Sequence, residues 1–346
     1  MIVKSIFVIY NYNINVLPSE VSMSTIKDVA KRAGVSIATV SHIVNGTKSV
    51  TPETRKKVMK AIKELNYTTN QTAKSFKTGR KNIIAFVVPD ISNNYFANII
   101  DSLEEELRKS DYHLIITNTK EKKEREFQQL KYLTSGIVDG IVLASAAQSY
   151  SEIRSFIPND FPVVLIDRKL ENSPLDIVNV SDNNAIATGM ERLILNGHTN
   201  IGYIGDSLYL STARERLQTY KDTLGNHSIP INNKFIKMTN SLSHEAYDLT
   251  GELLEEGCTA IVIGNNVMTV DAYSYIYKNR KNFANAQILG YYHRDLAQFF
   301  SSKDGIIMLN EKNMGIAAAR QILDRIKNPK QPQKEIIICN QYVAGD

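Results

Sequence analysis

Residues 34–46, GVSIATVSHIVNG, contain the pattern that predicts the fold of the N-terminal part of this chain. Gly34 supplies the conformational freedom for a tight turn, and Ser36 is a good N-cap for a following helix. Val40 provides an apolar anchor on the inner face of that helix. Small polar residues and one histidine, His42, lie between the apolar positions. The stretch therefore predicts a short helix with one buried face and one face open to solvent.

A second short helix is predicted immediately before this turn. Residues 26–33 place apolar side chains on one stripe, and the small Ala30 allows two helices to approach closely. Ala30, Gly34 and Val40 are spaced four and then six residues apart, which is typical of a helix-turn-helix. A third helix should begin at Thr51-Pro52-Glu53, because a hydroxyl N-cap, a proline at the first helical position and an acidic residue in the first turn all favour a helix start.

Charge is distributed unevenly along the chain. Residues 23–82 hold 13 Lys/Arg and three Asp/Glu, a net charge of +10, whereas residues 83–346 hold 27 basic and 32 acidic residues. A small basic head on a mildly acidic body is the charge distribution of a nucleic-acid-binding module joined to a larger domain. A basic surface that contacts only solvent is the alternative interpretation.

These motifs together resemble the head of the lactose/galactose-repressor family. The resemblance rests on residues 25–30 (TIKDVA), 33–46 (AGVSIATVSHIVNG) and 50–67 (VTPETRKKVMKAIKELNY). It implies that the second helix enters the major groove of DNA, with Ile37, Ala38 and His42 at base-reading positions and Thr39 and Ser41 nearer the backbone. The full set of expected DNA contacts in the head is Thr25, Ser36, Ile37, Ala38, Thr39, Ser41, His42 and Asn45.

The resemblance also implies a short hinge helix at about residues 70–77, which pairs with that of a second subunit over the minor groove. Asn70, Ala73 and Phe76 are its expected DNA contacts. Phe76 occupies the position of the family's apolar wedge, which is usually leucine. Such a wedge unstacks a base step at a cost of about a few kcal/mol, which additional contacts offset. Packing of Phe76 back onto the protein is the alternative.

The rest of the chain alternates apolar runs with amphipathic helical segments. Continuous Val/Ile/Leu runs are typical of parallel strands buried on both faces, and they occur at residues 83–89, 113–117, 140–143, 163–167, 201–205, 260–263 and 288–290. The body should therefore be α/β, with ligands bound at the carboxyl ends of its strands. There are more strands than one ordinary sheet holds, so two sheets are expected.

The family resemblance implies that these sheets form a two-lobed body like a periplasmic binding protein, closing on a small effector. The predicted organisation is a leader at 1–22, a helix-turn-helix domain at 23–68, a hinge and linker at 69–82 and an effector and dimerisation domain at 83–346. Lobe 1 should comprise about 83–182 and 310–327, and lobe 2 about 183–309 and 328–346. The chain would thus cross between lobes near Asp182, Asn310 and Asn328.

Candidate effector contacts follow from the resemblance position by position. Aromatic residues can stack on an apolar ring face, while Arg, Asn and Asp hydrogen-bond to hydroxyl or phosphate groups. The candidates are Tyr95, Phe96, Asp167, Asp182, Arg216, Asn265 and Tyr292. Core packing of the aromatics and helix capping by the aspartates are the alternatives.

One segment departs from the family pattern. Where the family commonly has acidic residues after a late strand, this chain has Gly290-Tyr291-Tyr292-His293-Arg294. Replacement of acids by Tyr, His and Arg favours aromatic stacking or anion binding. The sequence thus suggests that the effector is a phosphorylated or otherwise anionic metabolite rather than a plain neutral sugar.

Composition narrows the remaining possibilities. The 346 residues suffice for two or three domains, and Cys258 and Cys339 are too far apart in sequence to suggest a CxxC zinc site. No hydrolase elbow, P-loop, dinucleotide-binding or HExxH motif is present, so neither enzyme activity nor a cofactor is expected. The first 22 residues lack the long apolar stretch of a signal peptide; we expect them to be a poorly ordered extension preceding a start at Met23.

The sequence thus predicts a cytoplasmic, homodimeric, sequence-specific DNA-binding regulator, most simply a repressor, whose partners are double-stranded operator DNA and a small-molecule effector. No membrane or metal partner is expected. A solute-binding protein of a transporter would share the body fold and is the alternative. It would require an export signal and would have no basic head.

Overall fold

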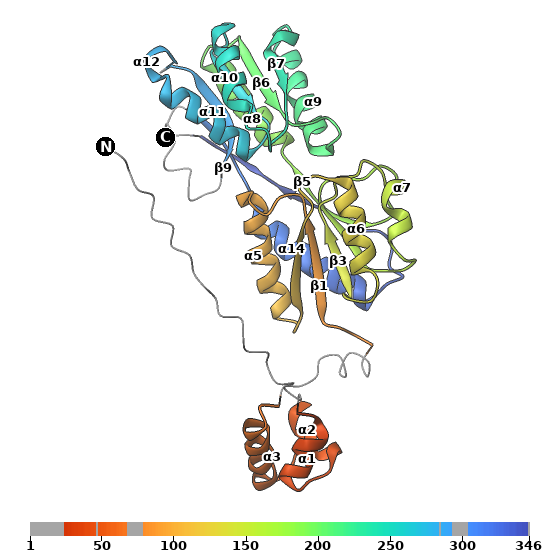
Figure 1. Cartoon of the computed structure of the whole chain (residues 1–346). Coiled ribbons are helices and arrows are strands. Elements are labelled where there is room, and N and C mark those ends of the chain that lie inside the picture. The colour runs from red at the N-terminus through yellow and green to blue at the C-terminus, as the bar shows by residue number, and fades with distance from the viewer. Residues whose placement is uncertain (1–23, 46–47, 68–78, 284, 293–303, 345–346) are drawn as a thin grey trace, which may run out of the picture. The chain divides into compact units, whose positions relative to one another are not determined.

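The computed structural model describes residues 24–45, 48–67, 79–283, 285–292 and 304–344 of the chain. It divides into two compact units, a small N-terminal head that ends at Arg80 and a larger body that begins at Lys81. Figure 1 draws both units. The predicted leader and the predicted hinge helix, including Asn70, Ala73 and Phe76, lie outside the described residues.

The head consists of three short helices, α1 (Ile26–Ala33), α2 (Ile37–Asn45) and α3 (Pro52–Glu64), as predicted. Each has a hydroxyl residue at its start: the side chains of Thr25, Ser36 and Thr51 accept hydrogen bonds from backbone N–H groups three residues on. Gly34 ends α1 with a φ of 68°, a conformation that glycine adopts without strain. The three helices enclose a small core of Val29, Ala30, Val40, Ile43, Val58 and Ala61.

The first half of the body is built on a six-stranded, fully parallel sheet. Its strand order is β11-β5-β4-β3-β1-β2. The strands are β1 (Ile83–Val88), β2 (His113–Asn118), β3 (Gly140–Leu143), β4 (Val163–Asp167), β5 (Asp176–Ser181) and β11 (Glu335–Cys339). We call this sheet and its helices lobe 1.

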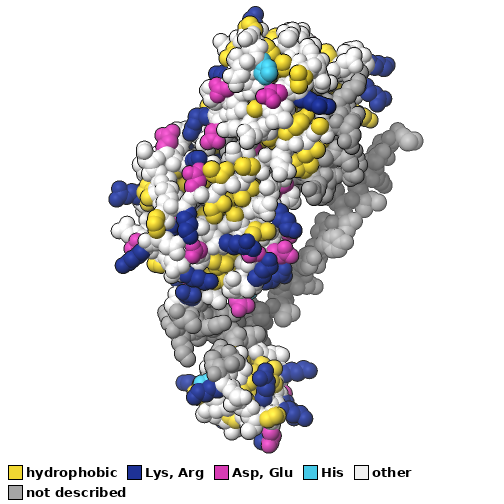
Figure 2. Space-filling view, turned by 180° about the vertical axis from the view of Figure 1, so that it is seen from behind, with side chains coloured by type: hydrophobic (Ala, Val, Ile, Leu, Met, Phe, Trp, Pro, Cys, Tyr) yellow, Lys and Arg dark blue, Asp and Glu magenta, His cyan; other side chains and the backbone are white. Residues whose placement is uncertain are grey.

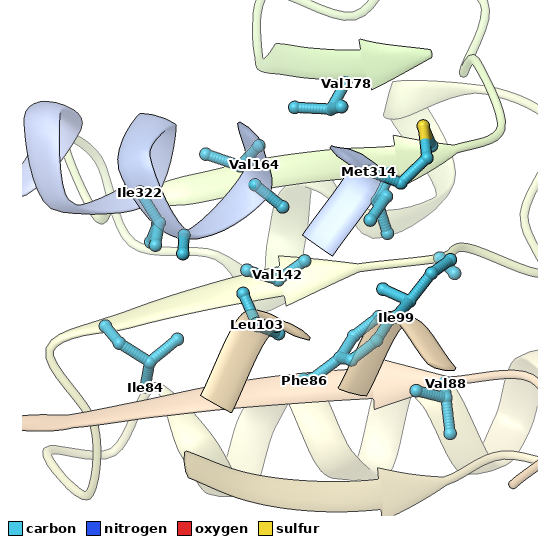
Figure 3. Close-up of a cluster of buried hydrophobic side chains, with 14 of the residues drawn as sticks. Ile84, Phe86, Val88, Ile99, Leu103, Val142, Val164, Val178, Met314 and Ile322 are labelled. Atoms are coloured by element: carbon cyan, nitrogen blue, oxygen red, sulfur yellow. The ribbon is translucent and has the colours of Figure 1, made fainter. Parts of the chain in front are cut away.

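Helices cover both faces of the lobe 1 sheet. Helices α5 (Asn94–Arg108) and α14 (Glu311–Lys327) pack on one face. Helix α6 (Lys123–Leu133), helix α7 (Tyr150–Ile153) and the 3₁₀ turn η1 (Arg154–Phe156) pack on the other face. The turn η1 directly follows α7. Figure 3 shows the first of these cores, where Phe86 of β1 and Val142 of β3 meet Ile99 and Leu103 of α5. Burial on both faces explains the continuous apolar runs in the sequence.

Lobe 2 repeats this arrangement with the strand order β12-β10-β9-β8-β6-β7, in which only β12 is antiparallel. Its strands are β6 (Ile201–Gly205), β7 (Ile236–Met238), β8 (Ala260–Ile263), β9 (Gln287–Tyr292), β10 (Gly305–Met308) and β12 (Gln341–Ala344). Its helical segments are α8 (Asn183–Leu195), α9 (Ser211–Asn226), η2 (Asn233–Phe235), α10 (Ala246–Glu255), α11 (Asn266–Lys278) and α12 (Arg280–Phe283).

The chain passes between the lobes three times. It leaves lobe 1 after β5 and starts α8 of lobe 2 at Asn183, and it returns between β10 and α14, at residues 309–310. The third crossing was predicted at Asn328, but this prediction is wrong. Strand β11 pairs in parallel with β5 and therefore still belongs to lobe 1, so the crossing occurs at Asn340, between β11 and β12.

Candidate DNA-binding face and ligand cleft

Helix α2 of the head has one buried and one accessible face. Val40 and Ile43 are buried in the head core, whereas Ala38 is exposed and the side chain of Ile37 is 44% exposed, high for such an apolar residue. Ser41 and His42 are half-buried. The predicted base-reading residues thus lie at or beside the accessible face. Asn45 ends the helix, and its side chain is not among those described.

Hydroxyl groups hold the start of α2 in place. The Ser36 hydroxyl accepts a hydrogen bond from the backbone N–H of Thr39 and lies 2.9 Å from the Thr39 hydroxyl. Thr25 performs the same capping role for α1, within a capping box with Asp28. Ser36 and Thr25 were predicted as DNA contacts, and both side chains are exposed while they cap their helices.

The acidic residues of the head are occupied by partners within the head. Asp28 belongs to the capping box, Glu53 lies 2.9 Å from Lys57, and Glu64 lies 2.8 Å from Arg32. Most of the basic side chains therefore remain available as surplus positive charge, and Figure 2 shows Lys and Arg side chains spread over the head surface. Such a surface attracts the phosphate backbone of DNA and makes the affinity salt-dependent.

The carboxyl ends of strands from both lobes border one cleft in the body. Its volume is about 460 Å³, within the range of about 300–1,000 Å³ typical of small-molecule sites. Lobe 1 contributes Asp90, Asn93, Tyr95, Phe96, Lys120, Glu121, Asp167 and Arg168. Lobe 2 contributes Asp206, Thr212, Arg216, His244, Asn265, Asn266 and Tyr291.

Two aromatic residues at the start of α5 form part of the lobe 1 wall. Tyr95 and Phe96 make an edge-on contact with ring centroids 5.2 Å apart, and the Tyr95 hydroxyl donates a 2.9 Å hydrogen bond to Asp167. Burial raises the pKa of Asp167 above its usual value, although Arg168 and Arg216 act against this. Asp167 also has a φ of 69°, a conformation that costs a non-glycine residue about 1–2 kcal/mol and often occurs at ligand sites.

Arg168 lies beside Asp167 and was not predicted from the sequence. Its guanidinium group donates two hydrogen bonds to the Glu121 carboxylate, at 2.6 and 2.8 Å. Burial alone would lower the pKa of Arg168, but the charges of Glu121 and Asp167 raise it above its usual value. Both Lys120 and Glu121 have positive φ, so the loop after β2 turns back toward the cleft. No sequence motif marked this loop.

Arg216 is the central charged residue of the lobe 2 wall. It donates hydrogen bonds to Asp182 at 2.6 Å and to the carbonyl of Gly264 at 2.7 Å, and its guanidinium carbon lies 4.5 Å from the centroid of the Tyr291 ring. Burial alone would lower the pKa of Arg216, but Asp182 raises it well above its usual value. These contacts fix the side chain in one position at the cleft.

Two predicted contacts do not line the cleft. Asp182 is only 4% exposed and acts behind the wall, where it accepts hydrogen bonds from Arg216, the Tyr291 hydroxyl and the Asn340 amide. Tyr292 is also buried, and its ring lies 5.6 Å from that of Tyr273. Successive side chains of a strand point to opposite faces, so Tyr291 rather than Tyr292 borders the cleft. His293 and Arg294 lie outside the described residues.

Asn265 and Asn266 follow β8 and connect the two walls. Asn265 caps α11 and donates a 2.9 Å hydrogen bond to Asp206, while Asn266 donates a 2.8 Å hydrogen bond to Asn93 of lobe 1. Asp206 and Asn266 were not predicted. Among the described residues, no cluster of His, Cys, Asp or Glu is arranged to bind a metal ion, and none of the helices described is long and apolar enough to cross a membrane.

Comparison with known proteins relates this architecture to one family. Residues 25–70 match the bacterial regulatory proteins of the lacI family, and residues 81–344 match the periplasmic binding proteins and sugar-binding domain of the LacI family. The PurR repressor of Vibrio parahaemolyticus is 31% identical over 331 residues, which cover 92% of this chain and 98% of that protein. The ribose operon repressor of Haemophilus influenzae is 30% identical over 328 residues, covering 91% and 96% of the two chains.

A crystal structure of the Lac repressor dimer bound to operator and the anti-inducer ONPF has the same fold. Its TM-score is 0.80 at 20% identity, covering 93% of this chain and 98% of that one. A helix-turn-helix head joined to a two-lobed body with a cleft defines a DNA-binding transcriptional regulator that responds to a small molecule. The chain belongs to the LacI family of such regulators and is not an enzyme.

Proposed function

We propose that this regulator is a homodimeric cytoplasmic repressor, which binds a two-fold operator through its heads and a small metabolite through the cleft. The observation that carries this proposal is the joint occurrence of two sites in one chain: an accessible, basic helix-turn-helix and a cleft bordered by both lobes. Each half-site would receive one α2 in the major groove. Localisation in the cytoplasm follows from the need to reach the operator.

Within the head, the predicted contacts divide into two roles. Ile37, Ala38 and His42 contact bases, while Thr25, Ser36, Thr39, Ser41 and Asn45 help to position the head on the DNA backbone. The accessible face of α2 supports this division. Asn70, Ala73 and Phe76 act in the minor groove as proposed from the family resemblance.

Within the cleft, Tyr95, Phe96, Asp167, Arg216 and Asn265 contact the effector, and Asp182 positions Arg216. One relative is named as a ribose operon repressor, and a 24%-identical LacI-family structure from Enterococcus faecium contains bound ribose. A metabolite of comparable size fits a cleft of about 460 Å³.

Apolar side chains on the outer face of α11 support dimer formation. Val270 is 51% exposed and Tyr277, two turns further along, is 72% exposed, so both lie on the same face of the helix. Exposed apolar side chains gathered on one face often mark a protein interface. We expect sedimentation equilibrium to give the mass of a dimer at micromolar concentration.

The test of the proposed function is DNA binding and its response to metabolites. The full chain should retard a fragment from the upstream region of its own operon in a gel shift, and one class of metabolite should alter that affinity. Failure to bind any such fragment, together with tight metabolite binding, would instead favour the solute-binding alternative.

A further inference from the structure

The positive charges that border the cleft are already paired with carboxylates of this chain. Lys120 lies 2.6 Å from Asp90, Arg168 is held by Glu121 at 2.6 Å, and Arg216 is held by Asp182 at 2.6 Å. An anionic ligand would have to replace one of these carboxylates or share its cation. Because such charge-assisted hydrogen bonds are short and strong, the cleft offers an anion little unsatisfied positive charge.

Asp206 differs from the other carboxylates of the cleft. It directly follows β6, and its two carboxylate oxygens accept hydrogen bonds from the backbone N–H of Ser207 at 2.8 Å and from the amide of Asn265 at 2.9 Å. Both donors are neutral. No ion pair to Asp206 is found among the residues that the structure describes, whereas the cleft carboxylates Asp90, Glu121 and Asp167 each contact a cation.

We propose that Asp206 determines the charge preference of the effector, by accepting a hydrogen bond from a hydroxyl or amino group and disfavouring ligands that carry phosphate or carboxylate. This inference rests on the proposed effector site. A negative group beside Asp206 would meet a like charge in a partly buried cleft, which is unfavourable. A donor group would instead gain a charge-assisted hydrogen bond, equivalent to about a 10- to 100-fold gain in affinity.

This inference replaces the anionic effector suggested by the sequence. That suggestion depended on Tyr292, His293 and Arg294. Tyr292 does not border the cleft, and the other two residues lie outside the described part of the chain. The cations that do border the cleft are paired.

The experiment compares neutral metabolites with their phosphate esters on the full chain. Ribose and ribose 5-phosphate, glucose and glucose 6-phosphate, and adenosine and adenosine monophosphate are matched pairs for thermal shift and isothermal titration. We expect a neutral member to stabilise the protein and its phosphate ester to bind at least about tenfold more weakly. Tighter binding of the phosphate member by the unchanged protein would overturn the inference while leaving effector control of the operator intact.

The Asp206→Asn variant tests the residue itself. It retains the size of the side chain, and we expect it to bind the neutral ligand about 10- to 100-fold more weakly and to discriminate less against the phosphate ester. Glu215→Gln is the matched control, because Glu215 lies on α9 of the same lobe but does not border the cleft. It should leave both affinities unchanged.

A cooperative thermal unfolding transition without ligand reports whether a variant is folded. If Asp206→Asn fails this check, Asp206→Ser replaces it. Unchanged affinity for the neutral ligand in a folded Asp206 variant would contradict the inference. The protein could also bind its operator and respond to no member of the three pairs. That result would contradict control by a metabolite of these classes, and with it the proposed role of Asp206.

Discussion

At the scale of single residues, we expect the ion pair between Arg216 and Asp182 to support the stability of the fold and, as proposed, the binding of the effector. Arg216 is 13% exposed and Asp182 4% exposed at the side chain. Removing one member of a buried pair leaves the other charge uncompensated, at a cost of about 3–5 kcal/mol. We expect Asp182→Ala to lower the free energy of unfolding by about this amount in urea denaturation.

The double variant Asp182→Leu/Arg216→Met separates stability from binding. Replacing both charges with apolar groups should restore much of the stability that Asp182→Ala loses. The double variant should still bind the effector weakly, because it lacks the guanidinium group of Arg216. A double variant no more stable than Asp182→Ala would mean that the pair is not the source of the effect.

His42 is the residue of α2 whose substitution should change sequence preference. The family resemblance places arginine most often at this position, and an arginine fork on guanine provides about 1–3 kcal/mol of discrimination. Histidine makes a shorter contact, so His42→Arg should shift base preference at one position of each half-site. Selection of binding sites from a random DNA pool measures this; an unchanged profile would show that His42 does not read a base.

Sequence motifs led to several residues that border the cleft, whose contact with an effector stays a prediction, but they could not decide between neighbouring residues of one strand. Tyr95 and Asn265, which follow β1 and β8, and Arg216 of α9 all border the cleft. Tyr291 and Tyr292 are indistinguishable by composition, and only the strand register settles which one faces the cleft. Arg168 and Asp206 follow strands without any distinctive spacing, so only the folded structure identifies them.

At the scale of elements, two hydrogen bonds join the lobes at the edges of the cleft. Ser211, at the start of α9, accepts a 2.9 Å hydrogen bond from the backbone N–H of Lys169, and Asn266 donates to Asn93. Ser211 is buried and does not itself border the cleft. Its hydroxyl can therefore be removed without deleting a ligand contact.

We expect Ser211→Ala to weaken effector binding by favouring an open arrangement of the lobes. The lost bond leaves a half-buried N–H unsatisfied in the closed form, at a cost of up to about 1–3 kcal/mol. If binding requires the closed form, this cost would lower effector affinity up to about 5- to 150-fold. Isothermal titration measures the affinity. Ser135→Ala is the control, because the exposed hydroxyl of Ser135 donates to the carbonyl of Tyr132 within lobe 1; equal effects of both variants would exclude the lobe contact as the cause.

Prediction of the strands depended on uninterrupted runs of apolar residues, so the buried strand β5, which Asn179 interrupts, was not predicted. The long apolar runs of β1, β3 and β4 are buried on both faces and were predicted from the sequence. Strand β11 alternates between exposed and half-buried residues at the edge of its sheet. Its run of Ile336, Ile337 and Ile338 marks a strand but does not show which sheet the strand joins, and the third crossing was misplaced for that reason.

At the scale of the whole molecule, the start of the body is anchored by one carboxylate. Asp139 accepts hydrogen bonds from the backbone N–H groups of Lys81 and Asn82, at 2.7–3.0 Å, just before β1. The chain reaches these residues from the predicted hinge. Any change in the lobes that is transmitted to the head along the chain must pass through this anchor.

We expect Asp139→Ala to retain effector binding in the cleft but to weaken its influence on the operator. Allosteric coupling free energies are typically about 1–3 kcal/mol, and each hydrogen bond to a carboxylate contributes a similar amount, about 1.5–3 kcal/mol. Loss of the anchor should therefore reduce the ratio of operator affinities with and without effector at least about fivefold. Gel shifts measure this ratio, and titration verifies the cleft. Asp101→Ala, on the exposed side of α5, is the control. An unchanged ratio in Asp139→Ala would mean that coupling reaches the head by another route.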